Sequence, residues 1–198
     1  MPNITDKIVR LIHWILRFRQ RKGYGIHSPF AFNFVTGVIY EQGTYYAYRQ
    51  LDDERKNCST RQLRRKDYRL LMRLANFQRP KTCLLFPAGQ ETLIHTFLKA
   101  GSCHTQYATF NLQDSTPARP ADMIVAATNW EQHADQLIQQ IKPGGLLVVV
   151  GLKNNKQRNA WKQMLMAPQA QVTFDLRDFG LLFYRPELQR EHYTINYL

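Results

Sequence analysis

The sequence predicts an α/β fold, in which a mostly parallel sheet is covered by helices, closes with an antiparallel hairpin and follows an N-terminal helical extension. Three observations lead to this prediction. Short apolar segments alternate with segments of helical periodicity from Thr82 onward. The run Leu146–Val150 is apolar at every position, as expected for a parallel strand that is buried on both faces. The last two apolar segments, Val172–Leu176 and Gly180–Tyr184, are joined by a very short turn, which favours an antiparallel hairpin at one edge of the sheet.

Residues 1–80 are predicted to form the helical extension. An amphipathic helix over residues 4–20 places its apolar residues at helical spacing, namely Ile8, Leu11, Ile12, Ile15 and Phe18. Ser28 and Pro29 predict the N-cap and first position of a second helix, whose apolar face carries Phe30, Phe34, Val35, Val38 and Ile39. Residues 46–79 are also predicted to be helical, with leucines on one side and many arginines elsewhere.

Residues 81–198 are predicted to form the sheet domain. Its strands before the closing hairpin are expected at Cys83–Phe86, Gln106–Leu112, Asp122–Ala127 and Leu146–Val150. Its helices are expected at Glu91–Lys99, Glu131–Ile141 and Asn159–Leu165. The segment Lys142-Pro143-Gly144-Gly145 is predicted to be a turn, because proline and glycine stop the preceding helix.

The length and the cysteines limit the class of protein. A chain of 198 residues favours one domain with an appendage. No apolar stretch approaches the roughly 18 residues of a membrane span, and no small-residue cleavage site follows the apolar run Ile8–Phe18, so no secretory signal is expected. Cys58, Cys83 and Cys103 form no CxxC pair, which favours reduced thiols and a cytoplasmic protein.

The charge is concentrated in the N-terminal part. The formal net charge is +12, and residues 1–80 hold 16 basic and 6 acidic side chains. Such a field attracts polyanions, either RNA or an anionic surface. Arg61, Arg64 and Arg65 are the candidate contacts, although a basic face that serves only solubility explains the same charge.

Several segments taken together resemble the class I methyltransferases that use S-adenosylmethionine. Asp122–Ala127, the Lys142-Pro143-Gly144-Gly145 turn and Leu146–Val150 are similar to strands four and five of that fold with the turn between them. The closing hairpin is similar to its antiparallel strands six and seven. The segment Tyr24-Gly25-Ile26-His27-Ser28-Pro29-Phe30 resembles a motif that precedes this domain in a group of bacterial members. The resemblance implies a Rossmann-like sheet and S-adenosylmethionine as cofactor.

The resemblance places the cofactor at the carboxyl ends of the parallel strands, as is usual in open α/β sheets. The expected binding residues are Phe86, Gly89, Gln90, Asn111, Thr128 and Asn129. The loop departs from the family pattern, because only Gly89 remains of its glycines and Pro87 removes a backbone donor. Asn111 stands where the family carries a carboxylate that binds the ribose. Binding is therefore expected to be weak or lost.

No metal is expected, because the strand ends offer none of the acidic residues that bind a divalent cation in related O-methyltransferases. Tyr24 and His27 are candidate substrate or partner residues, although a structural role, in which the His27 ring caps or packs, is the favoured alternative. Asp178-Phe179-Gly180 matches a kinase tripeptide by chance, since the other kinase motifs are missing.

Two main hypotheses for the function stay open. One is methyl transfer from S-adenosylmethionine to an unknown acceptor, which would rest on positioning the methyl group against a nucleophile. The other is a non-catalytic protein with the same fold, which binds a polyanion or a protein partner through its basic N-terminal face. A pocket for a different nucleotide-like ligand is a third reading.

Overall fold

The computed structural model describes residues 23–58, 63–86, 92–109 and 120–197. The helix expected at 4–20 and the expected site residues Arg61, Gly89, Gln90 and Asn111 lie outside this part of the chain. No helix within the described ranges has the length and hydropathy of a membrane span.

The strands form one seven-stranded sheet in the order β2-β1-β3-β4-β6-β5-β7. Their bounds are β1 (Thr82–Phe86), β2 (Gln106–Thr109), β3 (Ala121–Ala126), β4 (Ile141–Val150), β5 (Val172–Asp175), β6 (Phe179–Phe183) and β7 (Glu191–Thr194). The strands β2, β1, β3 and β4 are parallel, β6 is antiparallel to β4 and β5, and β7 is parallel to β5. This is the mostly parallel sheet with an antiparallel hairpin that the sequence predicts.

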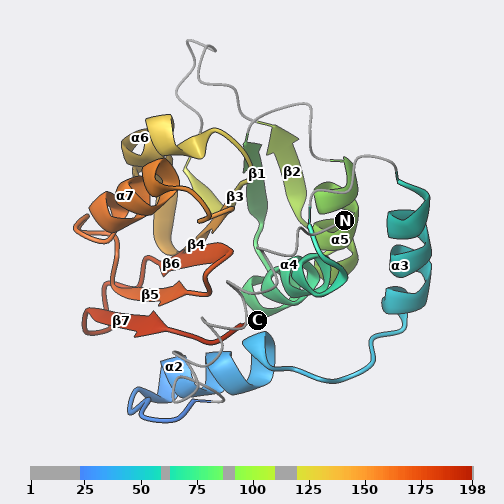
Figure 1. Cartoon of the computed structure of the whole chain (residues 1–198), viewed down its shortest axis with the longest axis horizontal. Coiled ribbons are helices and arrows are strands. Elements are labelled where there is room, and N and C mark those ends of the chain that lie inside the picture. The colour runs from blue at the N-terminus through green and yellow to red at the C-terminus, as the bar shows by residue number, and fades with distance from the viewer. Residues whose placement is uncertain (1–22, 59–62, 87–91, 110–119, 198) are drawn as a thin grey trace.

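Helices cover both faces of the sheet (Figure 1). They are α2 (Pro29–Phe34), the π-helical turn η1 (Val35–Ile39), α3 (Ala47–Asn57), α4 (Arg65–Gln78), α5 (Thr92–Gly101), the 3₁₀ turn η2 (Trp130–His133), α6 (Ala134–Gln139) and α7 (Asn155–Met164). One hydrophobic cluster joins the inward residues of α2, α4 and α5 to one face of the sheet. A second cluster joins those of α6 and α7 to the other face. The N-terminal helices therefore share a core with the sheet.

The two clearest sequence signals are confirmed. The side-chain oxygen of Ser28 accepts a hydrogen bond from the Ala31 backbone N–H at 3.4 Å, and Pro29 occupies the first position of α2. The run Leu146–Val150 lies in the centre of the sheet between β3 and β6, and its residues are at most 4% exposed.

Residues 46–79, which the sequence predicts to be helical, contain two helices separated by a break. The backbone is extended at Cys58, which ends α3, and again at Arg64, which begins α4. The Asp67 carboxylate accepts a hydrogen bond from the Arg64 backbone N–H at 3.1 Å, which is one half of a capping box. This local contact satisfies a backbone donor at the start of a helix and so favours a new start there.

The prediction of a turn at Lys142-Pro143-Gly144-Gly145 was wrong, because this segment lies within β4. The Gly144 N–H donates to the Tyr184 carbonyl at 2.6 Å, and the Tyr184 N–H donates to the Gly145 carbonyl at 3.0 Å. The register shifts between the pairs Ala121–Ile141 and Met123–Leu146, so the motif is an irregular start of the strand rather than the end of α6.

The hairpin was placed at an edge of the sheet, but β7 lies outside it and pairs with β5. The sequence of β7, Glu-His-Tyr-Thr, lacks the apolar run that marked the other strands. The resemblance matches β3 with strand four of the methyltransferase fold, which three strands precede. Within the described residues only β1 and β2 precede β3.

Candidate functional site

The order in which successive strands are added to the sheet reverses at β1. From β1 the chain continues to β2 on one side, and it later returns to β3 on the other side of β1. In open α/β sheets, ligands bind at the carboxyl ends of the strands where the order reverses. Phe86 and Ala126 end these strands side by side, and the Ala127 N–H donates to the Phe86 carbonyl at 2.8 Å.

Three of the expected cofactor residues lie at this edge. Phe86 is 5% exposed, and its ring meets the His133 ring edge-to-face with centroids 5.6 Å apart. Thr128 is half-buried and Asn129 is exposed. The backbone of Asn129 has a φ of 52°, a left-handed conformation that asparagine tolerates better than most residues. The other three, Gly89, Gln90 and Asn111, follow β1 and β2 in the sequence but lie outside the described ranges.

The segment after β3 is fixed by one buried indole. Trp130 has no exposed surface, and its Nε1–H donates to the Val150 carbonyl at the end of β4, 2.9 Å away. A hydrogen bond of this kind inside the core holds Asn129 against the end of the neighbouring strand. The core therefore anchors the segment that carries Thr128 and Asn129.

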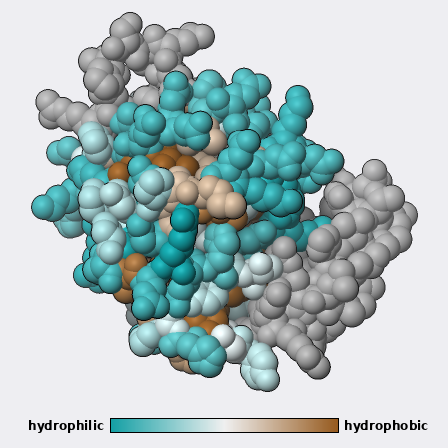
Figure 2. Space-filling model, turned by 90° about the vertical axis from the view of Figure 1, so that its left-hand side faces the viewer, coloured by the Kyte–Doolittle hydropathy of each residue, from teal (hydrophilic) through white to brown (hydrophobic). Residues whose placement is uncertain are grey.

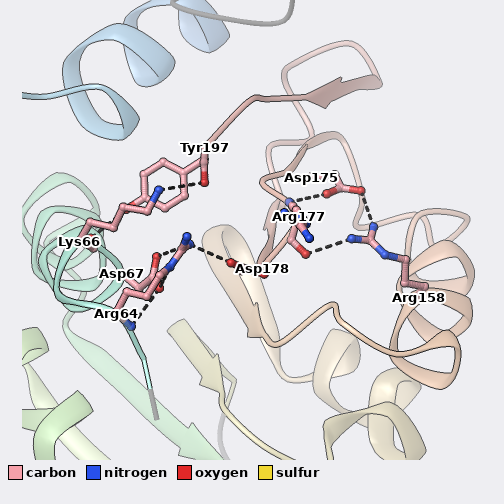
Figure 3. A network of polar contacts seen from close by, with 8 residues as sticks. All are labelled: Arg64, Lys66, Asp67, Arg158, Asp175, Arg177, Asp178 and Tyr197. Atoms are coloured by element: carbon pink, nitrogen blue, oxygen red, sulfur yellow. Dashed lines mark hydrogen bonds and ion pairs between the residues drawn. The ribbon is translucent and has the colours of Figure 1, made fainter. Parts of the chain in front are cut away.

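A charged network brings the start of α4 to the same edge (Figure 3). The Arg64 guanidinium binds Asp67 through Nε at 2.7 Å and Nη2 at 3.0 Å, and its Nη2 lies 2.8 Å from an Asp178 oxygen. Burial opposes the charge of Arg64, but Asp67 and Asp178 outweigh burial and raise the pKa of the guanidinium. Asp178 follows β5, and its carbonyl accepts from the Gly151 N–H just after β4 at 2.7 Å.

Tyr197, near the C-terminus, contacts the start of α4 beside Arg64 and Asp67. Its hydroxyl donates to the Lys66 carbonyl at 2.8 Å, while the Lys66 Nζ donates to the Tyr197 carbonyl at 3.2 Å and lies 4.4 Å from the ring centroid. Burial raises the pKa of the Tyr197 hydroxyl, so this group stays protonated and acts as a donor.

Arg65, another candidate contact for a polyanion, is held by a buried carboxylate. Its Nη2 lies 2.7 Å from Asp52, which Arg69 also binds at 2.5 Å. Burial alone would raise the pKa of Asp52, but the hydrogen bonds and charges of the two arginines hold it below its ordinary value. Arg64 and Arg65 therefore both carry charges that carboxylates of this chain offset.

Tyr24 and His27 are exposed and lie in the segment before α2. Figure 1 shows α2 at the opposite end of the molecule from the arrowhead of β2, so the structure does not bring these two residues to the carboxyl edge.

The sequence did not single out Asp67, Asp178 or Tyr197 as site residues. Asp178 stands in the tripeptide that matches a kinase motif by chance, and its partner Arg64 comes from a distant part of the chain. The one signal in the sequence that could have indicated Asp178 as a site residue is its position directly before the apolar segment Phe179–Phe183. Within the described part of the chain, no three His, Cys, Asp or Glu side chains gather as metal ligands.

No protein-family model and no curated protein matches the chain. Solved structures do match it. An SAH-bound methyltransferase of Podospora anserina has a TM-score of 0.56 at 8% identity, with 93% of this chain and 98% of that chain covered. The fold is that of the class I methyltransferases.

Two further structures agree with this fold. A Corynebacterium glutamicum protein has a TM-score of 0.53 at 12% identity and covers 78% of this chain and 97% of its own. A Staphylococcus aureus protein assigned as a caffeoyl-CoA O-methyltransferase has a TM-score of 0.52 at 10% identity and covers 72% and 93%. Identities this low establish the fold of the chain and not its reaction.

Proposed function

We propose that this protein binds S-adenosylmethionine at the carboxyl edge of β1, β2 and β3 and transfers its methyl group to an acceptor. The observation that carries the proposal is the strand order, which reverses beside β1. The fold is shared with a methyltransferase that was crystallised with SAH. The proposed binding residues are Phe86, Gly89, Gln90, Asn111, Thr128 and Asn129.

The chemistry of these residues suits the uncharged adenosine part of the cofactor. Thr128 and Asn129 offer a hydroxyl and an amide, and Phe86 offers a ring. None of the six proposed residues is cationic, whereas sites for phosphate-bearing nucleotides use cations or glycine-rich backbone N–H groups. This composition favours an adenosine group without phosphates.

The cofactor would supply an electrophilic methyl group, and the task of the protein would be positioning. Trp130 and the Ala127–Phe86 hydrogen bond fix the end of β3, while Arg64, Asp67 and Asp178 fix the start of α4 at the same edge of the sheet. These contacts hold the surroundings in which an acceptor would be placed.

Calorimetric titration with S-adenosylhomocysteine tests the proposal. We expect saturable but weak binding, because Asn111 offers a neutral hydrogen bond in place of a charged one. Asn111→Asp should therefore tighten binding about tenfold, the difference between a neutral and a charge-assisted hydrogen bond. Asn155→Asp, on an exposed position of α7, is the matched control and should leave the affinity unchanged.

Absence of binding to both the parent protein and Asn111→Asp at millimolar ligand would overturn the proposal. That outcome would favour the non-catalytic alternative, in which the basic N-terminal part binds a polyanion and affinity falls steeply with salt. The alternative draws less support from the structure, because a polyanion would compete with Asp52, Asp67 and Asp178 for Arg64 and Arg65.

A further inference from the structure

A hollow lies between α7 and the outer strands β5 and β7. Its lining consists of Arg158, Trp161, Lys162, Leu165, Asp175, His192, Tyr193 and Thr194, and its volume is about 190 Å³. In the sheet order, β5 is four strand positions from β1, which corresponds to roughly 19 Å at the usual strand spacing. The hollow is therefore separate from the proposed methyl-transfer site.

The position of α7 creates the hollow. The Trp161 ring packs so closely on β6 that a Cβ at Gly180 would lie 2.8 Å from it. This contact centres the helix over β6, and the sheet continues beyond it through β5 to β7. The side of the molecule that carries α7 and β7 faces the viewer in Figure 2, where hydrophilic residues surround small hydrophobic areas.

The strand face below α7 is polar where a covered sheet is usually apolar. By register Thr173 pairs with His192 and Asp175 with Thr194, and the Thr173 hydroxyl shares a hydrogen bond with the His192 Nδ1. On the opposite face the Phe174 ring stacks with the ring of Tyr193, with centroids 5.4 Å apart, and Tyr193 also borders the hollow. Because side chains alternate between faces, the sequence itself assigns polar groups to the hollow.

The cations around the hollow outnumber the anions. The single carboxylate of the lining, Asp175, is offset by Arg158 Nη1 at 3.1 Å and accepts from the Arg177 N–H at 2.7 Å, and Arg158 Nη2 donates to the Arg177 carbonyl at 3.0 Å (Figure 3). These contacts orient the guanidinium and leave others of its five N–H donors for a ligand.

Two further cations have no carboxylate partner within the part of the chain that the structure describes. Lys162 lies one turn from Arg158 on α7 and has no carboxylate partner among the described residues. Arg190 donates to the Leu165 and Ala167 carbonyls at 2.6 and 2.8 Å, which places its guanidinium at the end of α7. Burial and then the charge of Arg190 lower the pKa of His192, while the charge of Asp175 acts in the opposite direction.

We propose that this hollow binds a small organic phosphate. Arg158, Lys162 and Thr194 supply a fork of N–H groups, an ammonium and a hydroxyl, which together suit a tetrahedral anion. Trp161 and Leu165 supply an apolar wall for a carbon group. The volume is below the roughly 300–1,000 Å³ of pockets for drug-sized ligands, so the carbon group is small.

Titration calorimetry with phenyl phosphate and with inorganic phosphate tests this site on the full chain, independently of methyl transfer. We expect saturable binding of phenyl phosphate that Lys162→Gln weakens about tenfold, the loss typical of one charge-assisted hydrogen bond. Lys156→Gln removes the same charge from an exposed position of the same helix, outside the lining, and should change the affinity less than twofold.

The two probes distinguish the sources of the phosphate. Tighter binding of phenyl phosphate supports a phosphate monoester, whereas equal binding supports the phosphate group alone as the ligand. No saturable binding at millimolar concentrations would overturn the proposal. An equal loss in Lys156→Gln and Lys162→Gln would also overturn it, because it would mean that the surface attracts anions without a site. Thermal melts of both variants establish that they remain folded.

Discussion

At the scale of single residues, the arginines of the N-terminal part are structural as well as charged. Arg64 joins the start of α4 to Asp178, and Arg65 and Arg69 enclose the buried Asp52. Buried carboxylates are costly unless they are paired and hydrogen-bonded. Part of the positive charge of this segment therefore neutralises acids inside the same chain.

Asp52 makes the stability depend on pH. Its pKa is lower in the folded than in the unfolded chain, so its contribution is complete above the unfolded value of about 3.9 and is lost as the pH falls through the folded value. We expect Asp52→Asn to destabilise the protein by about 2 kcal/mol at neutral pH, the typical worth of hydrogen bonds to a charged group.

Thermal melts of Asp52→Asn and the parent protein as a function of pH measure this effect. The difference in Tm should be constant near neutrality and shrink below about pH 4. Asp53→Asn is the matched control, because Asp53 is exposed and pairs only with the exposed Lys56 among the described residues. A difference that persists unchanged in acid would contradict the assignment.

At the scale of elements, β4 is the centre of the sheet. Val148 has no exposed surface and lies between Val125 of β3 and Leu181 of β6. An unpaired carboxylate at this position costs several kcal/mol, a large part of the stability of a domain. We expect Val148→Asp to prevent folding.

Circular dichroism and the yield of soluble protein test this prediction. Met166→Asp introduces the same group at a side chain that is 79% exposed and should fold normally. A soluble Val148→Asp variant that melts cooperatively would show that β4 tolerates a charge in its core, which the packing excludes.

Those elements that bury an apolar pattern could be predicted from the sequence. The cap at Ser28 and the run Leu146–Val150 are signals that depend only on neighbouring residues, and both are confirmed. The strand β7 could not be predicted in this way, since Glu191–Thr194 lies at an edge, and its pairing with β5 depends on register rather than on hydropathy.

The candidate site likewise has a part that local sequence patterns predict and a part that only the folded structure shows. Strand ends predicted that Phe86, Thr128 and Asn129 share an edge, because parallel strands end together. The partnership of Arg64 with Asp178 joins two distant segments through the folded sheet, so no local pattern in the sequence indicates it. The hollow beside α7 depends on how one indole packs against Gly180, and this too is visible only in three dimensions.

At the scale of the whole molecule, the N-terminal helices and the sheet depend on one another. Phe34 of α2 packs against Phe174 and Phe183 with ring centroids 4.9 Å apart in each case, so strands near the end of the chain bury a helix from its first part. The Tyr40 hydroxyl donates to the Asn196 carbonyl at 2.5 Å, a second contact between the first and last parts of the described chain. Such contacts between distant segments favour unfolding of these parts as one cooperative unit.

The two carboxylates that bind Arg64, those of Asp67 and Asp178, become available to it at different stages of folding. Asp67 is one helical turn away and is available to the chain before any sheet exists, whereas Asp178 arrives only after β5 and β6 have docked on β4. In stopped-flow experiments, Asp178→Asn should therefore speed unfolding and leave the refolding rate nearly unchanged. Refolding slowed as strongly as unfolding is accelerated would mean that the guanidinium bridge already exists at the barrier. Arg64 would then affect the rate of folding as well as the stability of the folded domain.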